Sequence, residues 1–330
     1  MSNIFRTILQ PQPSAFRMSH QSNILCLGSC FAENIGNRLE YFKFHTSLNP
    51  FGILYNPISM AKGVAILLDE KRLFKDSDLF EHLGMWHSFQ HHGSFSFPDK
   101  KIALQKMNSS LETARLFLQK TNFLILTLGT SNVFVDKKSN EVVANCHKLP
   151  QQNFYKKALS AELITKHLQM TIEDLQTHFP KIKIIITVSP VRHIRDGLVE
   201  NQISKSRLLL AANDIFQQYT HVHYFPAYEL LLDDLRDYRF YKKDMIHPND
   251  LAVDYIWDFF AKTFFDQNTT ALNTKIEKLQ AAAAHRPIRP QSATYQKFVA
   301  NQVRKMDDLE EQFPFLDFEK ERTQMRSSSL

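Results

Sequence analysis

The stretch NILCLGSCFAENIGNRLEYF, residues 23–42, decides the fold. Residues 23–28 form a short apolar run that ends in glycine, which predicts a buried strand. The residues after it follow a helical spacing, with apolar side chains on one face at Phe31, Ile35, Leu39 and Phe42. We therefore expect a strand, a tight turn at Gly28-Ser29 and a helix in immediate succession.

Similar apolar runs recur along the chain, at residues 123–128, 182–188 and 221–225. Helical stretches lie between them, at about 105–120, 158–178 and 200–218. Strands that alternate with helices indicate an α/β fold. Because the strands are apolar without interruption, the sheet is expected to be mainly parallel and covered on both faces.

Two segments are interpreted as additions to this α/β domain of residues 1–265. Residues 69–100 are polar and rich in His and Phe, and we expect an insertion there. Residues 266–330 are expected to form a helical C-terminal extension with a disordered tail.

Composition excludes several classes of protein. The chain has 330 residues, of which 43% are hydrophobic and 22% charged, as in ordinary globular proteins. The formal charge of +6 is scattered, so no nucleic-acid partner is expected. The sequence shows neither a secretory signal nor an apolar run of ~20 residues, so no membrane association is expected. The 3 Cys form no paired framework, which predicts a cytoplasmic protein.

Ser29 is the first candidate for chemistry. It follows a strand and begins a helix, and α/β folds place ligands at the carboxyl edge of the sheet. Backbone N–H groups at the helix start can stabilise a developing oxyanion. The alternative is that Ser29 serves only as a helix N-cap.

The second candidate is the segment Asp244-Met-Ile-His247-Pro-Asn249. A serine hydroxyl needs a base to remove its proton, and histidine is the natural base near neutral pH. A carboxylate beside the histidine fixes its tautomer. A spacing of three can bring Asp244 and His247 together in a turn. The alternative is a helix entrance with a surface salt link.

Several ordered stretches resemble the GSCFA family of SGNH (GDSL-like) hydrolases. Residues 28–32 spell GSCFA, and further stretches follow in order at 49–57, 128–131, 145–148, 189–191 and 244–249. The resemblance implies a flavodoxin-like three-layer α/β/α sandwich with a mainly parallel central sheet, the SGNH hydrolase fold. It makes Ser29 the nucleophile, His247 the base and Asp244 its orienting partner. It implies no cofactor and no metal.

The resemblance also implies oxyanion donors. These are the Ser29 backbone, Gly52 and an Asn of the third stretch, where this chain has Gly129-Thr130-Ser131. Asn132 follows one place later, and Asn49 is the alternative donor. Thr130 belongs to the same stretch and is a candidate for substrate binding.

Five histidines have a structural interpretation beside a functional one. His193 follows a predicted strand and could bind an anionic or polyol group, or belong to a plain loop. His147 stands beside Cys146, and pocket lining or a structural role is expected. His87, His91 and His92 are spaced as a metal cluster could be, but flanking Gly and Ser favour a loop, so we expect a lid or pocket wall instead.

The sequence thus favours a serine esterase acting on a small-molecule ester, with an O-acyl group on a carbohydrate or other polyol as the expected substrate. Two alternatives stay open. One is acyl transfer to a sugar by the same triad, with residues 69–100 as a lid that excludes water. The other is a non-catalytic ligand-binding module. A homo-oligomer is also possible.

Overall fold

The computed structural model describes residues 6–286 and 288–327. Its centre is a five-stranded sheet in the order β10-β9-β5-β1-β2, in which every neighbouring pair is parallel. The strands are β1 (Asn23–Gly28), β2 (His45–Leu48), β5 (Phe123–Leu128), β9 (Lys183–Val188) and β10 (Val222–Phe225). This is the doubly wound order of flavodoxin-like folds, so the predicted fold class is confirmed.

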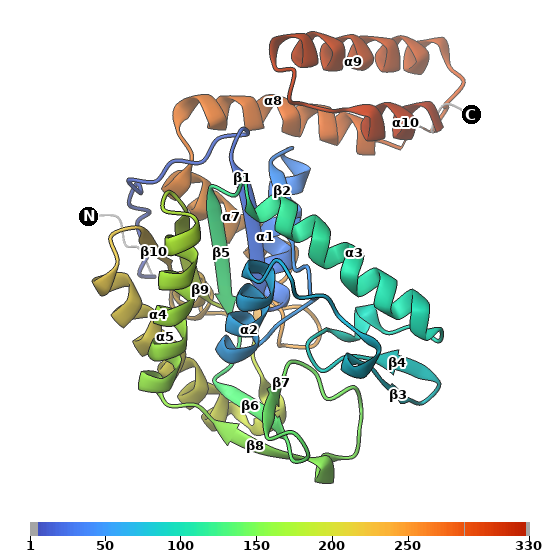
Figure 1. The fold of residues 1–330 in the computed structure, drawn as a ribbon. Coiled ribbons are helices and arrows are strands. Elements are labelled where there is room, and N and C mark those ends of the chain that lie inside the picture. Colours follow the sequence, from blue (N-terminus) through green and yellow to red (C-terminus); the bar gives the residue numbers. More distant parts are fainter. Residues whose placement is uncertain (1–5, 287, 328–330) are drawn as a thin grey trace.

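Helices cover both faces of the sheet (Figure 1). One face packs against α1 (Cys30–Tyr41) and α7 (Asp250–Phe264). The other packs against α2 (Pro57–Leu68), α3 (Lys100–Leu118), α4 (Ala161–His178) and α5 (Leu198–Gln218). The chain moves outward from β1 in both directions, and right-handed crossovers then place the helices on opposite faces.

The core follows from alternation along the buried strands. In β1, Leu25 and Leu27 face the α2–α5 layer, whereas Ile24 and Cys26 face the α1–α7 layer. All four side chains are almost completely buried. Burying each such side chain contributes roughly 1.5–3 kcal/mol, which is why an uninterrupted apolar run becomes a central strand.

Residues 69–100 carry a small hairpin, β3 (Phe80–His82) and β4 (Met85–His87), with short 3₁₀ turns at Asp76–Asp78 and Gly93–Phe95. His91 is buried among Phe51, Phe74 and Phe95. The four-residue spacing of His87 and His91 therefore does not define a helix face.

Sequence periodicity missed several elements. A separate antiparallel sheet, β7-β6-β8, consists of β6 (Asn132–Asp136), β7 (Glu141–Val143) and β8 (Phe154–Ala158). β2 and α2 were also not predicted. The helix expected from residue 158 begins at Ala161, because Ser160 caps it and residues before it pair as β8. β8 escaped prediction because four of its five side chains are exposed, which removes the apolar signal.

The C-terminal extension is helical, as predicted. It consists of α8 (Gln267–Ala284), α9 (Ala293–Gln312) and α10 (Glu319–Ser327). Figure 1 shows these helices at the amino-terminal end of the strands, opposite the β6–β8 sheet. They bury Phe318 and hold a largely buried ion pair, Lys43 Nζ to Glu321 Oε2 at 2.7 Å. The disordered tail was expected at residues 327–330; Ser327 instead ends α10, and residues 328–330 lie outside the described part.

Short helical turns, Ala227–Glu229, Leu230–Leu235 and Tyr238–Phe240, connect β10 to the loop before α7. Within the described residues, no helix combines the length and apolar character needed to cross a membrane.

Candidate active site

Ser29 lies at the point where the strand order reverses. β1 runs between β2 and β5, and ligands of doubly wound sheets bind at the carboxyl edge of this reversal. The turn needs glycine at residue 28, because φ is +147° and an added Cβ would lie 2.4 Å from the Thr127 carbonyl oxygen. Ser29 caps α1, its Oγ accepting from the Phe31 N–H at 3.4 Å, and it is fully buried. The Ser29 hydroxyl therefore lies at the N-terminus of α1.

Asp244 and His247 form a pair in the loop before α7. Asp244 Oδ2 lies 2.7 Å from His247 Nδ1. Asp244 Oδ1 accepts the backbone N–H groups of His247 at 3.0 Å and Ile246 at 2.9 Å. These bonds, the His247 N–H first, lower the pKa of Asp244 to about 2. The carboxylate is therefore ionised at neutral pH and oriented toward the imidazole.

The loop that holds this pair is fixed at both ends. Asn249 caps α7, its Oδ1 accepting from the Ala252 N–H at 3.0 Å. Lys242 N–H donates to the His247 carbonyl at 2.8 Å. The His247 side chain is 42% exposed, so water can reach the imidazole.

No hydrogen bond joins Ser29 to His247 in the described structure, where the Ser29 Oγ accepts from the Phe31 N–H. Tyr55 links the turn after β5 to His193. The Tyr55 carbonyl accepts the N–H groups of Gly129 and Thr130, both at 2.9 Å. Its ring meets the His193 ring edge-on, with centroids 5.4 Å apart.

His193 lies in the electrostatic field of His247. Burial, then the nearby Lys205 charge, lower the pKa of His193 to about 4, with a further contribution from His247. Its ring is therefore neutral at pH 7. Its Nε2 is buried and has no hydrogen-bond partner in the described structure. His193 can therefore offer a neutral, unpaired ring nitrogen to a ligand.

Asn49 is the candidate oxyanion donor whose side-chain amide has no partner among the described residues. Its Oδ1 accepts the Gly28 N–H at 2.9 Å, next to the nucleophile candidate. Its Nδ2 is buried and has no partner in the described residues. A buried amide without a partner is costly, so a negative oxygen there would satisfy it.

Three other expected donors already have hydrogen-bond partners in the structure. The Gly52 N–H donates to the Asn49 carbonyl at 2.7 Å, and the Ser29 N–H donates to the Thr127 carbonyl at 3.1 Å. The Asn132 amide donates to Asp196 Oδ2 at 3.0 Å. Each of these groups is therefore already paired. The Gly52 bond closes a turn, the Ser29 bond joins the ends of β1 and β5, and the Asn132 bond holds the start of β6.

Two further candidates have structural contacts. Thr130 is buried, and its Oγ1 lies 3.0 Å from Ser204 Oγ. His147 Nε2 lies 2.8 Å from the Ser88 carbonyl oxygen, and its ring packs at a tilt of 35° against the His87 ring, with centroids 4.5 Å apart. Burial lowers the pKa of His147 to about 4. His147 thus anchors the 69–100 insertion.

A lysine that sequence reasoning missed lies beneath the site. Lys205 on α5 is 1% exposed, and its Nζ donates to the carbonyls of Gly129 at 2.6 Å and Ser189 at 2.7 Å. The signal was present, because Lys205 precedes Leu208 and Ala212 by three and seven residues and so falls on the apolar stripe of the helix.

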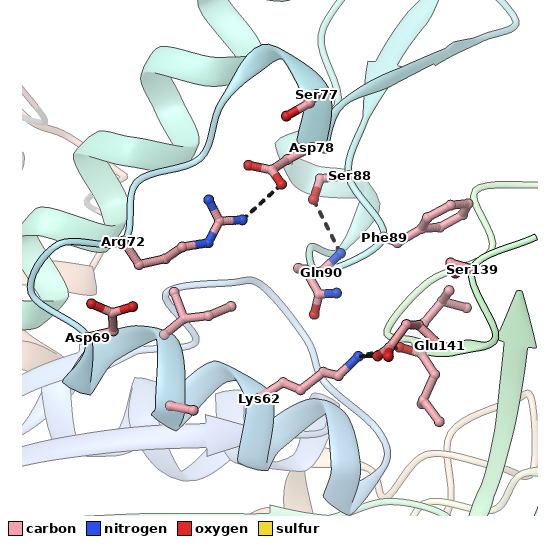
Figure 2. A pocket seen from close by; sticks show the side chains of 14 residues that line it. Lys62, Asp69, Arg72, Ser77, Asp78, Ser88, Phe89, Gln90, Ser139 and Glu141 are labelled. Carbon is pink, nitrogen blue, oxygen red and sulfur yellow. Dashed lines mark hydrogen bonds and ion pairs between the residues drawn. The ribbon is translucent and has the colours of Figure 1, made fainter.

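Two cavities are lined by residues outside the candidate triad. One, of about 160 Å³, lies beside the 238–247 loop and is lined by Arg192, Leu198, Asn201, Gln202, Tyr228, Leu232 and Tyr238. A larger one, of about 530 Å³, lies between α2, the insertion and β7, and Figure 2 shows its side chains. Its cations are paired, Lys62 with Glu141 and Arg72 with Asp78. Neither Ser29 nor His247 lines it, so the insertion's cavity is separate from the candidate triad.

Comparison with solved structures gives distant matches. A proposed platelet activating factor from Streptococcus pneumonia is 12% identical, with a TM-score of 0.38, covering 72% of this chain and 82% of its own. A carbohydrate esterase family 3 structure from Talaromyces cellulolyticus is 8% identical, with a TM-score of 0.37, covering 78% and 99%. Among curated proteins, none matches the chain.

Comparison with models of protein families shows which family the chain belongs to. The model of the GSCFA family matches residues 23–260, which is more than half of the chain and spans Ser29, Asp244 and His247. The model of the GSCFA domain protein C-terminal domain matches residues 276–328, which corresponds to the helical extension. The chain therefore belongs to the GSCFA family.

Proposed function

We propose that this chain is a serine hydrolase of the SGNH type that cleaves esters, with Ser29, His247 and Asp244 as its triad. One observation carries the proposal. The hydrogen-bonded Asp244–His247 pair precedes α7, while Ser29 begins α1 at the reversal of the sheet order. Acid, base and hydroxyl are the groups that acyl transfer through serine requires.

In the proposed reaction, Ser29 Oγ attacks the acyl carbonyl carbon while His247 Nε2 accepts its proton. Asn49 Nδ2 and the first N–H groups of α1 stabilise the resulting oxyanion. Collapse breaks the bond to the alcohol oxygen, and His247 returns the proton to that oxygen. Water then attacks the acyl-enzyme with the same base, releasing the acid and Ser29. The attack by Ser29 requires its hydroxyl to donate to His247 Nε2, a contact that the described residues do not make.

The proposed substrate is a small polyol or carbohydrate that carries an O-acyl group, as the family resemblance implies. The 160 Å³ cavity is not lined by Ser29, Asp244 or His247, but its polar side chains, including Arg192, Asn201 and Gln202, suit hydroxyl groups of a substrate that extends from the triad. The exposure of His247 favours hydrolysis over transfer, because water reaches the base freely. The missing Ser29–His247 bond is the observation that favours a non-catalytic binding module instead.

A fluorophosphonate probe tests the proposal, because it reacts only with an activated serine. We expect one adduct, located at Ser29 by mass spectrometry, and none in Ser29→Ala. Ser160→Ala is the matched control, since Ser160 also caps a helix through its Oγ. Absence of labelling in the folded wild type would contradict the proposal and favour the binding module.

Product analysis then separates the two reactions. With glucose pentaacetate as substrate and glycerol as added acceptor, a hydrolase releases acetate in full yield. Acetylglycerol as the main product would instead identify a transferase.

A further inference from the structure

Lys205 is a buried charge without a carboxylate partner. Its Nζ lies within 2.7 Å of two main-chain carbonyl oxygens, and no ion pair involves it among the described residues. Burying an ammonium group costs several kcal/mol unless it is paired and hydrogen-bonded. Two neutral carbonyls compensate this cost only in part, and an apolar residue at this helix position would avoid it. A role at the site would explain the charge.

The two carbonyls belong to the carboxyl edge of the sheet. Gly129 directly follows β5 and Ser189 directly follows β9, so Lys205 bridges the ends of neighbouring strands. Gly129 also forms the wall against the proposed nucleophile. A Cβ at Gly129 would lie 3.3 Å from Ser29 Cβ and 2.8 Å from the Tyr55 carbonyl oxygen. Lys205 therefore fixes backbone that touches Ser29.

The charge also acts on side chains from two elements. On α1, the Cys30 thiol next to Ser29 interacts electrostatically with Lys205. In the loop after β9, the Lys205 charge contributes to the lowered pKa of His193, which in turn lies in the field of His247. The Lys205 charge therefore acts on one residue beside Ser29 and on one residue of the loop after β9.

We propose that Lys205 is a positioning residue of the serine site, whose ammonium group holds the turns after β5 and β9 against Ser29 and favours negative charge on the reacting acyl oxygen. This inference rests on the proposed hydrolase function. Substitution acts through the backbone that Lys205 binds, so Lys205 itself is not assigned contact with the substrate.

An alternative role for a buried lysine is that of a general base for Ser29. The two roles require opposite protonation states. Burial lowers the pKa of Lys205 to about 7, so the population of each state changes within the usual assay range. The groups that face it are Cys30 on α1 and His193 in the loop after β9. If Lys205 positions the site as an ammonium group, its contribution to the Ser29 reaction rate falls as pH rises above 7. If it is a general base, that contribution rises over the same range.

The test measures the rate of fluorophosphonate labelling from pH 6 to 9 in wild type, Lys205→Met and Lys205→Arg. We expect Lys205→Met to fold and to label about 10–100-fold more slowly, the scale for misplaced reacting groups. Lys205→Arg should recover most of the rate and should lose the alkaline decline seen in wild type. Arg207→Met on the same helix is the control for charge removal and should label at the wild-type rate.

A second measurement needs no variant. A boronic acid forms a tetrahedral anionic adduct with an activated serine, so phenylboronic acid places a negative charge at Ser29. With ¹³C-labelled lysine, we expect this adduct to raise the pKa at which the Lys205 signal titrates. An unchanged titration, or wild-type labelling by folded Lys205→Met, would overturn the inference while leaving the hydrolase proposal intact. Failure of wild type itself to label would overturn both.

Discussion

Two hydrogen bonds join His247 to the carboxylate of Asp244 within one turn of chain, one from the imidazole and one from the backbone. Nδ1 lies 2.7 Å from Oδ2, and the backbone N–H of His247 donates to Oδ1 at 3.0 Å. The carboxylate therefore fixes both the ring and the backbone that carries it. With Nδ1 protonated toward Asp244, Nε2 is the nitrogen left to accept a proton.

Asp244→Asn should remove this orientation while keeping the shape of the side chain. An amide N–H presented to Nδ1 selects the wrong tautomer, so we expect ester hydrolysis to fall by about 10³-fold or more. The initial rate with glucose pentaacetate measures this. Asp237→Asn, which alters a cap nearby at Arg239 N–H, is the control and should stay near wild type. Equal rates in both variants would show that Asp244 has no part in the reaction.

Asn49→Asp should separate the two functions of the Asn49 side chain. Aspartate keeps an oxygen for the Gly28 N–H but replaces the unpaired Nδ2 donor with an acceptor. Loss of an oxyanion donor typically costs about 10²–10³-fold in rate, and we expect a decrease on that scale with the fold retained.

The control for Asn49→Asp is Asn56→Asp, a buried asparagine that caps α2 through its Oδ1. Hydrolysis rates and circular dichroism are compared for both variants. A wild-type rate in Asn49→Asp would assign the oxyanion to other donors.

The buried amine of Lys205 should make the difference in unfolding free energy between wild type and Lys205→Met depend on pH. Burial holds its pKa at about 7 in the folded chain, below the unfolded value of 10.5. Between these values the unfolded chain binds more protons, so stability rises with pH relative to a variant without the amine. The free energy of unfolding of wild type minus Lys205→Met should therefore increase by about 1 kcal/mol per pH unit above pH 7. Urea unfolding at pH 6, 7, 8 and 9 measures it, and parallel curves would contradict the prediction.

Gly28→Ala should destabilise the nucleophile turn. The backbone at residue 28 has a φ of +147°, and the new Cβ would overlap the Thr127 carbonyl oxygen at 2.4 Å. We expect a loss of about 2–3 kcal/mol or more in unfolding free energy, because both strain and backbone overlap must be relieved. Gly93→Ala, where nothing lies within 4 Å of the added Cβ, should be nearly neutral in the same urea titration.

Much of the fold could be predicted because its signals are local. The buried strands β1, β5 and β9 read as apolar runs, and the helix after residue 28 reads from its spacing. β6, β7 and β8 could not be predicted in this way. They are short and half exposed, and they exist because they pair with one another rather than because of their own composition.

In the candidate site, too, some contacts are local in sequence and others are not. Asp244 and His247 are three residues apart, so their bond depends on one turn of chain. The Ser29 N–H and the Asn132 amide are engaged by residues far along the chain, Thr127 and Asp196, which local patterns do not specify.

By itself, the amino-acid sequence determined the alternation of strands and helices, the junction at Ser29 and the Asp244–His247 turn, because periodicity and short spacings act within a few residues. Only the tertiary structure decided which N–H groups are free and that Lys205 binds the carbonyls of Gly129 and Ser189. Those contacts join residues 76 and 16 positions apart, and no local pattern specifies which partners the packing of helices on a sheet brings together.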